Sequence, residues 1–229
     1  MRPFVYLPAD VQHDAPTVAA APLGGVIIDL EDGVSPDRKV EARAALRALV
    51  DRLRGAAPLL LVRINSPDTA EGAADLQIVG ELPADVRLLV PKPVTPETLR
   101  SALEAGGARR LWCMAEEADL ADRLEYLLAG TPGLEGVVFG SKDMLESLGL
   151  PFDLDRPELP EASARIQQRA SALGLRFVDG IAVGRNRIAS ATRRARGAGY
   201  DGITLARLSD AFVAAAAIAS PPTPSTIAG

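Results

Sequence analysis

Charged side chains follow short apolar runs at several points along the chain. The residues at these points are Asp29, Glu31, Asp32, Arg63, Lys92, Glu116, Glu117, Asp143 and Asp179. Carboxylate oxygens are ligands that Mg²⁺ prefers, and an arginine can bind a substrate carboxylate through two parallel hydrogen bonds. If these side chains meet, they can hold a metal ion beside an oxoacid and stabilise the enolate that forms when a carbon–carbon bond breaks or closes.

Within this set, Glu116 and Asp143 are the candidate magnesium ligands and candidate substrate contacts, and Arg63 is the candidate clamp for a substrate carboxylate. The further candidate catalytic residues are Asp29, Glu31, Asp32 and Lys92.

Each position also has a structural interpretation. Asp29 could bond backbone amides, Arg63 could be an ion-pair partner for a nearby acid, and Glu117 could be the first-turn acid of a helix. Charged residues at the ends of six separate apolar runs favour a shared site over scattered surface charge.

Other chemistries find little support in the sequence. His13 is the only histidine, which argues against a histidine-based zinc site and against a Ser–His–Asp triad unless His13 serves it. No glycine-rich phosphate loop or Gly-x-Ser-x-Gly motif occurs. A Schiff base on Lys92 or Lys142 has no marker beyond the position of these lysines. The single cysteine, Cys113, lies in an apolar run and is interpreted as a packing residue.

The elements that must position these residues can be read from the apolar runs. Eight runs are apolar on both faces, as is typical of strands in a buried parallel sheet. They are Phe4–Leu7, Gly25–Leu30, Leu59–Ile64, Arg87–Pro91, Leu111–Ala115, Gly136–Phe139, Arg176–Ile181 and Gly202–Leu205. Amphipathic segments between them predict helices over Pro36–Arg54, Thr95–Ala105, Glu117–Ala129, Pro160–Leu173, Asn186–Gly197 and Ser209–Ala219.

Strands that alternate with helices in 229 residues predict an α/β fold, a (β/α)8 TIM barrel formed by one domain over residues 1–219. An open doubly wound sheet is the alternative. In a barrel, the carboxyl ends of the strands meet on one face, where active sites collect. Leu150–Pro160 is the longest predicted irregular connection, and residues 220–229 are predicted to form a disordered tail.

Composition narrows the class of partner and the compartment. The net charge of −5 argues against a nucleic-acid partner and against an anionic membrane surface. No apolar window is long enough for a membrane span, and the amino terminus has no signal-peptide pattern. One cysteine permits no internal disulfide, which fits a reducing cytoplasm.

Several segments resemble one known family. Ile28-Asp29-Leu30-Glu31-Asp32-Gly33-Val34 is similar to the Leu-Asp-Leu-Glu-Asp-Ala-Val segment of the citrate lyase beta subunit family, within the class II aldolases and acyl-CoA lyases. Matching segments follow in the same order over nearly the whole chain: Arg2–Asp10, Val62–Asn65, Pro91-Lys92, Phe139–Met144, Val178–Gly180 and Gly199–Gly202.

The resemblance implies a barrel that assembles into trimers or hexamers and holds Mg²⁺ through Glu116 and Asp143. It implies that Arg63 binds an oxoacid such as oxaloacetate or glyoxylate, and that citryl- or malyl-type thioesters of coenzyme A or of an acyl carrier protein are cleaved. Coenzyme A would then be part of the substrate and not a resident cofactor. Other lyase subunits could work beside the chain.

The chain departs from the family pattern at four places. The first metal ligand could be Glu117 instead of Glu116, Lys142 replaces an acid, and Ile203–Leu208 lacks the His-Pro motif. No C-terminal lid is evident, so the acid–base group is sought among Asp29, Glu31, Asp32 and Asp179. Two alternatives to a thioester lyase therefore stay open. One is a class II aldolase on a free 2-oxo acid, and the other is a catalytically weak homologue that binds a metabolite.

Overall fold

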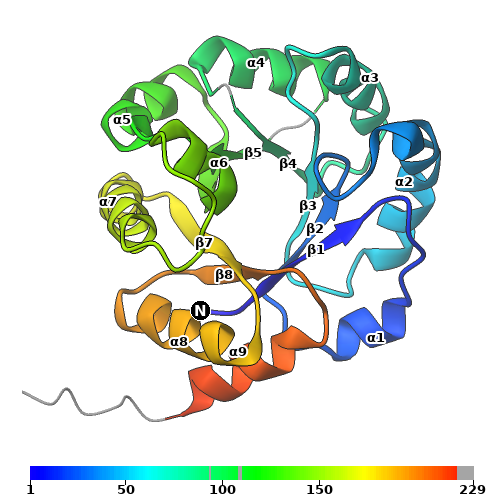
Figure 1. Ribbon diagram of the computed structural model, residues 1–229. Coiled ribbons are helices and arrows are strands. Elements are labelled where there is room, and N and C mark those ends of the chain that lie inside the picture. The colour runs from blue at the N-terminus through cyan, green and yellow to red at the C-terminus, as the bar shows by residue number, and fades with distance from the viewer. Residues whose placement is uncertain (93, 108–109, 221–229) are drawn as a thin grey trace, which may run out of the picture.

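The chain forms a closed barrel of eight parallel strands surrounded by helices, as the computed structural model shows (Figure 1). The structure describes residues 1–92, 94–107 and 110–220. The strands are β1 (Phe4–Pro8), β2 (Gly25–Asp29), β3 (Leu60–Arg63), β4 (Arg87–Val90), β5 (Leu111–Ala115), β6 (Leu134–Phe139), β7 (Arg176–Ala182) and β8 (Gly202–Leu205). Each strand pairs with the next, and β1 pairs with β8, so the predicted barrel is confirmed and the open sheet is wrong.

Helices cover the outside of the ring. They are α1 (Ala15–Ala20), α2 (Lys39–Leu53), α3 (Ala70–Val79), α4 (Pro96–Ala105), α5 (Leu120–Gly130), α6 (Ser141–Ser147), α7 (Glu158–Ala172), α8 (Arg185–Gly197) and α9 (Asp210–Ala219). A short 3-10 turn, η1 (Pro36–Arg38), precedes α2. The six predicted helices are present, and α1, α3 and α6 were not predicted.

The barrel interior is filled by every second strand residue, because successive side chains point to opposite faces. Phe4, Ile27, Leu61, Trp112 and Val178 form much of this inner cluster. Two residues further along their strands stand Tyr6, Asp29, Arg63 and Met114. Two of the candidate residues, Asp29 and Arg63, therefore belong to the uppermost layer of the barrel interior, at the carboxyl ends of the strands.

Trp112 lies in the lower part of this interior. It is fully buried on β5, its ring is tilted against Phe4 at 6.2 Å between centroids, and the Arg176 guanidinium lies 5.4 Å from the ring centre. Gly136 on β6 provides the necessary room, because a Cβ at that position would lie 2.8 Å from the indole.

An outer core joins the strands to the helices. Outward-facing strand residues such as Val26 and Ile28 pack in the same cluster as Leu46 and Val50 of α2. The connection from α6 to α7 is irregular from Leu148 to Pro157, close to the predicted Leu150–Pro160. The predicted tail lies outside the described residues from position 221 onward.

Candidate active site

A cavity of about 370 Å³ lies at the carboxyl end of the barrel. Its lining contains most of the charged residues singled out from the sequence: Asp29, Asp32, Arg63, Glu116, Lys142 and Asp143. Its apolar lining residues include Pro8, Met114, Phe139, Phe152, Ile181 and Ala206. A cavity that combines apolar side chains with a few charged groups is typical of a small-molecule site.

Arg63 lies at the floor of this cavity in a fixed orientation. Its Nε and Nη2 atoms donate to the two oxygens of Asp29 at 2.8 and 2.7 Å, and its Nη1 lies 2.8 Å from Glu31 Oε2. The guanidinium also lies over the Tyr6 ring, 4.7 Å from its centre. Two of the five guanidinium N–H groups thus donate to Asp29 and Nη1 forms an ion pair with Glu31, while Arg63 also lines the cavity.

Asp29 binds the backbone of the loop that follows β2 as well as the Arg63 side chain. Its Oδ1 accepts a hydrogen bond from the Glu31 amide and its Oδ2 accepts one from the Gly33 amide, both at 2.9 Å. With the two bonds from Arg63, the four acceptor positions of the carboxylate are filled. Asp29 is therefore placed to position Arg63 and the β2 loop, and it has no acceptor site left for a substrate proton.

Glu31 is partly buried beside this pair. Burial raises the pKa of Glu31 to about 8, although the Arg63 cation opposes the shift. Glu31 does not line the cavity, and it contacts the site through Arg63.

Glu116 stands at the end of β5 with 3% of its surface exposed. Burial raises the pKa of Glu116 to about 7, and the nearby Asp143 charge adds to this shift. The Lys92 amide donates a hydrogen bond to Glu116 Oε2 at 3.1 Å and opposes the shift. Gly140 makes room for this carboxylate, because a Cβ there would lie 2.4 Å from Glu116 Cγ.

Asp143 lies on α6 across from Glu116 and is bound by Lys92. The Lys92 Nζ is 2.8 Å from Asp143 Oδ1 and 3.5 Å from Glu146 Oε2. A cationic group thus already neutralises this carboxylate. Lys92 does not line the cavity and contacts it through Asp143.

The Glu116–Asp143 pair fits a magnesium site by the chemistry of its donors. One carboxylate follows β5 and the other lies on α6, just after β6, near enough for the charge of Asp143 to raise the pKa of Glu116. A hard dication needs such a pair from the protein when waters and substrate complete its shell. No cluster of three or more metal-ligating side chains occurs among the described residues. Glu117, the alternative metal ligand, does not line the cavity. Its Oε2 accepts hydrogen bonds from Arg123 at 3.0 Å and from the Val94 amide at 3.2 Å.

Asp32 and Lys142 meet at the rim of the cavity. The Lys142 Nζ donates to Asp32 Oδ2 at 3.2 Å, and both side chains are more than half exposed, at 64% and 56%. Asp32 follows β2, whereas Lys142 is the second residue of α6.

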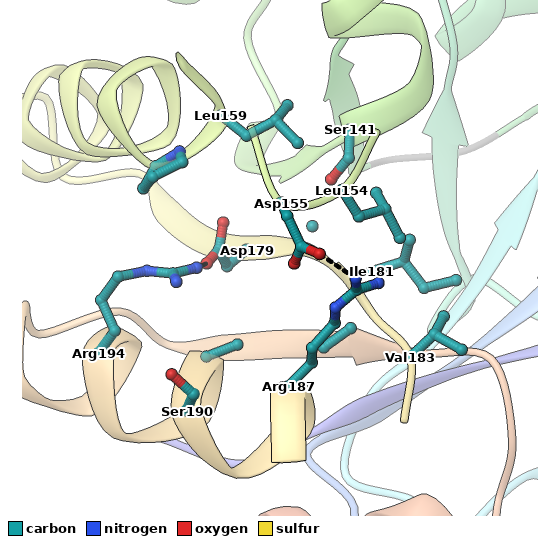
Figure 2. Close-up of a pocket in the computed structure, with 14 residues that line it drawn as sticks. Ser141, Leu154, Asp155, Leu159, Asp179, Ile181, Val183, Arg187, Ser190 and Arg194 are labelled. Atoms are coloured by element: carbon teal, nitrogen blue, oxygen red, sulfur yellow. Dashed lines mark hydrogen bonds and ion pairs between the residues drawn. The ribbon is translucent and has the colours of Figure 1, made fainter. Parts of the chain in front are cut away.

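Asp179 lines a different cavity. Figure 2 shows it in a neighbouring pocket of about 160 Å³ between α7 and α8, with Arg194 and Arg187 on one side. Its Oδ1 accepts from Ser163 at 2.6 Å and its Oδ2 accepts from Arg194 at 3.0 Å. Asp179 is thus held by structural partners outside the central cavity.

A buried network beneath the β2 loop was not foreseen. Lys39 Nζ donates to the Leu30 carbonyl at 2.6 Å, to the Glu31 carbonyl at 2.7 Å and to Asn65 Oδ1 at 2.8 Å. Asn65 in turn donates to Asp75, which is fully buried. No pattern in the sequence distinguishes Lys39 from the other charged residues of this amphipathic helix.

Comparison with known proteins places these observations in a family. The family model described as HpcH/HpaI aldolase/citrate lyase matches residues 2–211. A protein named (3S)-malyl-CoA thioesterase from Cereibacter sphaeroides is 30% identical over 181 residues, which cover 79% of this chain and 62% of that protein. A mitochondrial citramalyl-CoA lyase from Mus musculus is 26% identical over 78% of this chain and 58% of its own length. The chain thus spans about three fifths of these curated relatives.

Solved structures agree with this assignment. Protein CitE from Mycobacterium tuberculosis in complex with magnesium, acetoacetate and coenzyme A is 26% identical, with a TM-score of 0.80 over 96% of this chain and 81% of that chain. A citrate lyase beta subunit from M. tuberculosis with oxaloacetate and magnesium is 25% identical, with a TM-score of 0.75 over 95% and 96%. None of the described helices is long and apolar enough to cross a membrane. From its barrel, its cavity and the family match over residues 2–211, this chain belongs to the HpcH/HpaI aldolase/citrate lyase family.

Proposed function

We propose that this chain is a magnesium-dependent carbon–carbon lyase that cleaves, or forms, a citryl- or malyl-type thioester of coenzyme A. The observation that carries the proposal is the immobilised Arg63 on the same cavity as the Glu116–Asp143 pair. Relatives with magnesium, oxoacids and coenzyme A in their structures support it.

The charged residues around the cavity have different roles in the proposed reaction. The remaining N–H groups of Arg63 bind the carboxylate of the oxoacid part, and Asp29 and Glu31 keep the guanidinium in place. Glu116 and Asp143 would hold Mg²⁺, with Lys92 orienting Asp143. Bound magnesium would polarise the carbonyl and lower the energy of the enolate.

The proton transfers need an acid–base group. In the cleavage direction the substrate hydroxyl loses a proton, the carbon–carbon bond breaks, and the enolate of the thioester takes up a proton. Asp32 is the first candidate acceptor because it lines the cavity and keeps acceptor positions free, whereas those of Asp29 are filled. The apolar lining residues Met114 and Ile181 exclude water from the enolate.

A thioesterase is the second candidate, because the relative named (3S)-malyl-CoA thioesterase is 30% identical. Hydrolysis would release free coenzyme A thiol without breaking a carbon–carbon bond. The two reactions are therefore separable by their products.

The test measures both products with malyl-, citramalyl- and citryl-CoA in the presence of Mg²⁺. We expect oxoacid release without free thiol, and a loss of about 100-fold in kcat/KM for Arg63→Lys, since lysine cannot replace the forked contact. Arg165→Lys, at an exposed pair with Asp122, is the matched control. Thiol without oxoacid would identify a thioesterase, and neither product would favour the catalytically weak homologue.

We further propose that the chain works as a cytoplasmic homo-oligomer, a trimer or a hexamer. Light scattering coupled to size-exclusion chromatography tests the oligomeric state, and a monomer would contradict it.

A further inference from the structure

The ion pair between Lys142 and Asp32 crosses the entrance of the cavity. In a closed ring of eight strands taken in chain order, β2 and β6 lie opposite each other. Asp32 follows β2 and Lys142 follows β6, and Figure 1 shows α6 on the far side of the ring from β2. The bond of 3.2 Å therefore spans the entrance and does not run along one wall.

The charge around the cavity is unevenly distributed. Among the described residues that line it, the carboxylates are Asp29, Asp32, Glu116 and Asp143, and the cations are Arg63 and Lys142. Arg63 is already paired with Asp29 and with Glu31. Among the described lining residues, Lys142 is thus the one cation at the entrance, where the far end of a ligand bound to Arg63 would extend.

The bond that Lys142 makes is easily exchanged. Exposed ion pairs contribute little to stability, because water screens both charges and two long side chains must be ordered. Lys142 and Asp32 are 64% and 56% exposed. A ligand carboxylate can replace Asp32 as the partner of the ammonium group at little cost, particularly one already anchored at its other end.

We propose that Lys142 is a specificity-determining residue that binds a second carboxylate of the substrate. The site would then favour thioesters whose oxoacid part carries a carboxylate at each end over those whose oxoacid part carries one. This inference rests on the proposed function, because it assumes that Arg63 holds the first carboxylate.

The test compares oxaloacetate with pyruvate, which differs from it by the distal carboxylate and is also its decarboxylation product. Both are titrated calorimetrically into wild type and Lys142→Met in saturating Mg²⁺. We expect Lys142→Met to weaken oxaloacetate binding roughly tenfold, as the loss of one charge-assisted hydrogen bond implies, and to change pyruvate binding less than twofold. Lys142→Arg keeps the charge and is expected to keep the preference.

Asp32→Asn separates a binding role from a structural one. It frees Lys142, so oxaloacetate should bind as tightly as to wild type or a few-fold more tightly. Weaker oxaloacetate binding to Asp32→Asn, or an equal effect of Lys142→Met on both ligands, would overturn the inference and leave the proposed function standing. Failure of folded wild type to bind either oxoacid would overturn both.

Discussion

At the scale of single residues, the carboxylates of the site differ in their hydrogen-bond partners, and these partners determine the role of each. Asp29 is saturated by Arg63 and by two backbone amides, whereas Glu116 faces the cavity with one amide partner. The same chemical group is thus a structural support in one place and an available ligand in the other. Carboxylates whose environments differ in this way are typical of catalytic sites.

Glu116 should make stability depend on pH in the metal-free protein. Its pKa is raised from 4.5 to about 7, so the folded state binds this proton more tightly than the unfolded chain does. The resulting stabilisation is fully present below about pH 4.5 and is lost as the pH rises through about 7, a change of about 3 kcal/mol. Glu116→Gln should make that decline shallower and leave the part caused by Glu31, whose pKa is also raised, as measured by urea unfolding followed by circular dichroism in EDTA at pH 4.5 to 8.

The matched control for this experiment is Glu117→Gln, which removes the neighbouring carboxyl group and leaves the cavity untouched. A decline with pH that persists unchanged in Glu116→Gln would mean that another group is responsible, and Glu31 would be the next residue to test.

At the scale of elements, the turn from β6 into α6 determines how Glu116 and Asp143 meet. Gly140 is the N-cap of α6, with φ of −101° and ψ of 92°, a conformation open to any residue. It is the missing side chain that matters, because a Cβ would lie 2.7 Å from Glu116 Oε1. Gly140→Ala should therefore destabilise the protein by about 1–3 kcal/mol by overpacking and weaken Mg²⁺ binding, as urea unfolding and calorimetric titration would measure.

Gly197→Ala is the control for this substitution, because a Cβ at that position meets nothing within 4 Å. It should be neutral or slightly stabilising, since alanine favours a helix more than glycine does. Equal behaviour of the two variants would contradict the role given to Gly140.

The elements themselves were largely predictable. Each of the eight predicted strands is found within two residues of its expected bounds, because strands buried on both faces leave a continuous apolar run. Helix α6 was missed because Ser141–Ser147 is short and its charged residues read as a loop. Helix α3 was missed because its pattern is weak, with an aspartate, Asp75, buried among its apolar residues.

The partners of the candidate residues were not predictable. The sequence placed Arg63, Glu116 and Asp143 on one face through the barrel rule alone. It could not indicate that Glu117 pairs with Arg123 or that Asp179 faces the neighbouring pocket, because these contacts depend on the direction of each side chain. Contacts between opposite loops, such as that of Lys142 with Asp32, exist only once the ring is closed.

At the scale of the whole molecule, the barrel closes between the two strands that share the fewest paired positions. Strands β1 and β8 share two paired positions, Phe4 with Thr204 and Val5 with Leu205, the fewest of the eight described strand pairs. Strands β5 and β6 share five. A sheet opens most easily where fewest bonds must break, and local opening controls amide exchange.

The amides that bridge β1 and β8 should therefore exchange with deuterium before those of β5 and β6 in the native protein. Hydrogen–deuterium exchange under native conditions, read by mass spectrometry of peptides, measures this order. Slower exchange across the β1–β8 pair than across β5–β6 would show that the surrounding helices, and not the strand pairing, determine where the barrel opens.

The position of Trp112 provides a natural optical probe. It is the only tryptophan in the chain, and it is buried in the lower half of the barrel next to the Arg176 guanidinium. The cavity occupies the opposite end. The intrinsic fluorescence of the protein therefore comes from one indole in one environment. Its emission should shift to longer wavelength when the barrel unfolds and stay unchanged when a ligand binds, so that folding can be followed without a label and without interference from substrate.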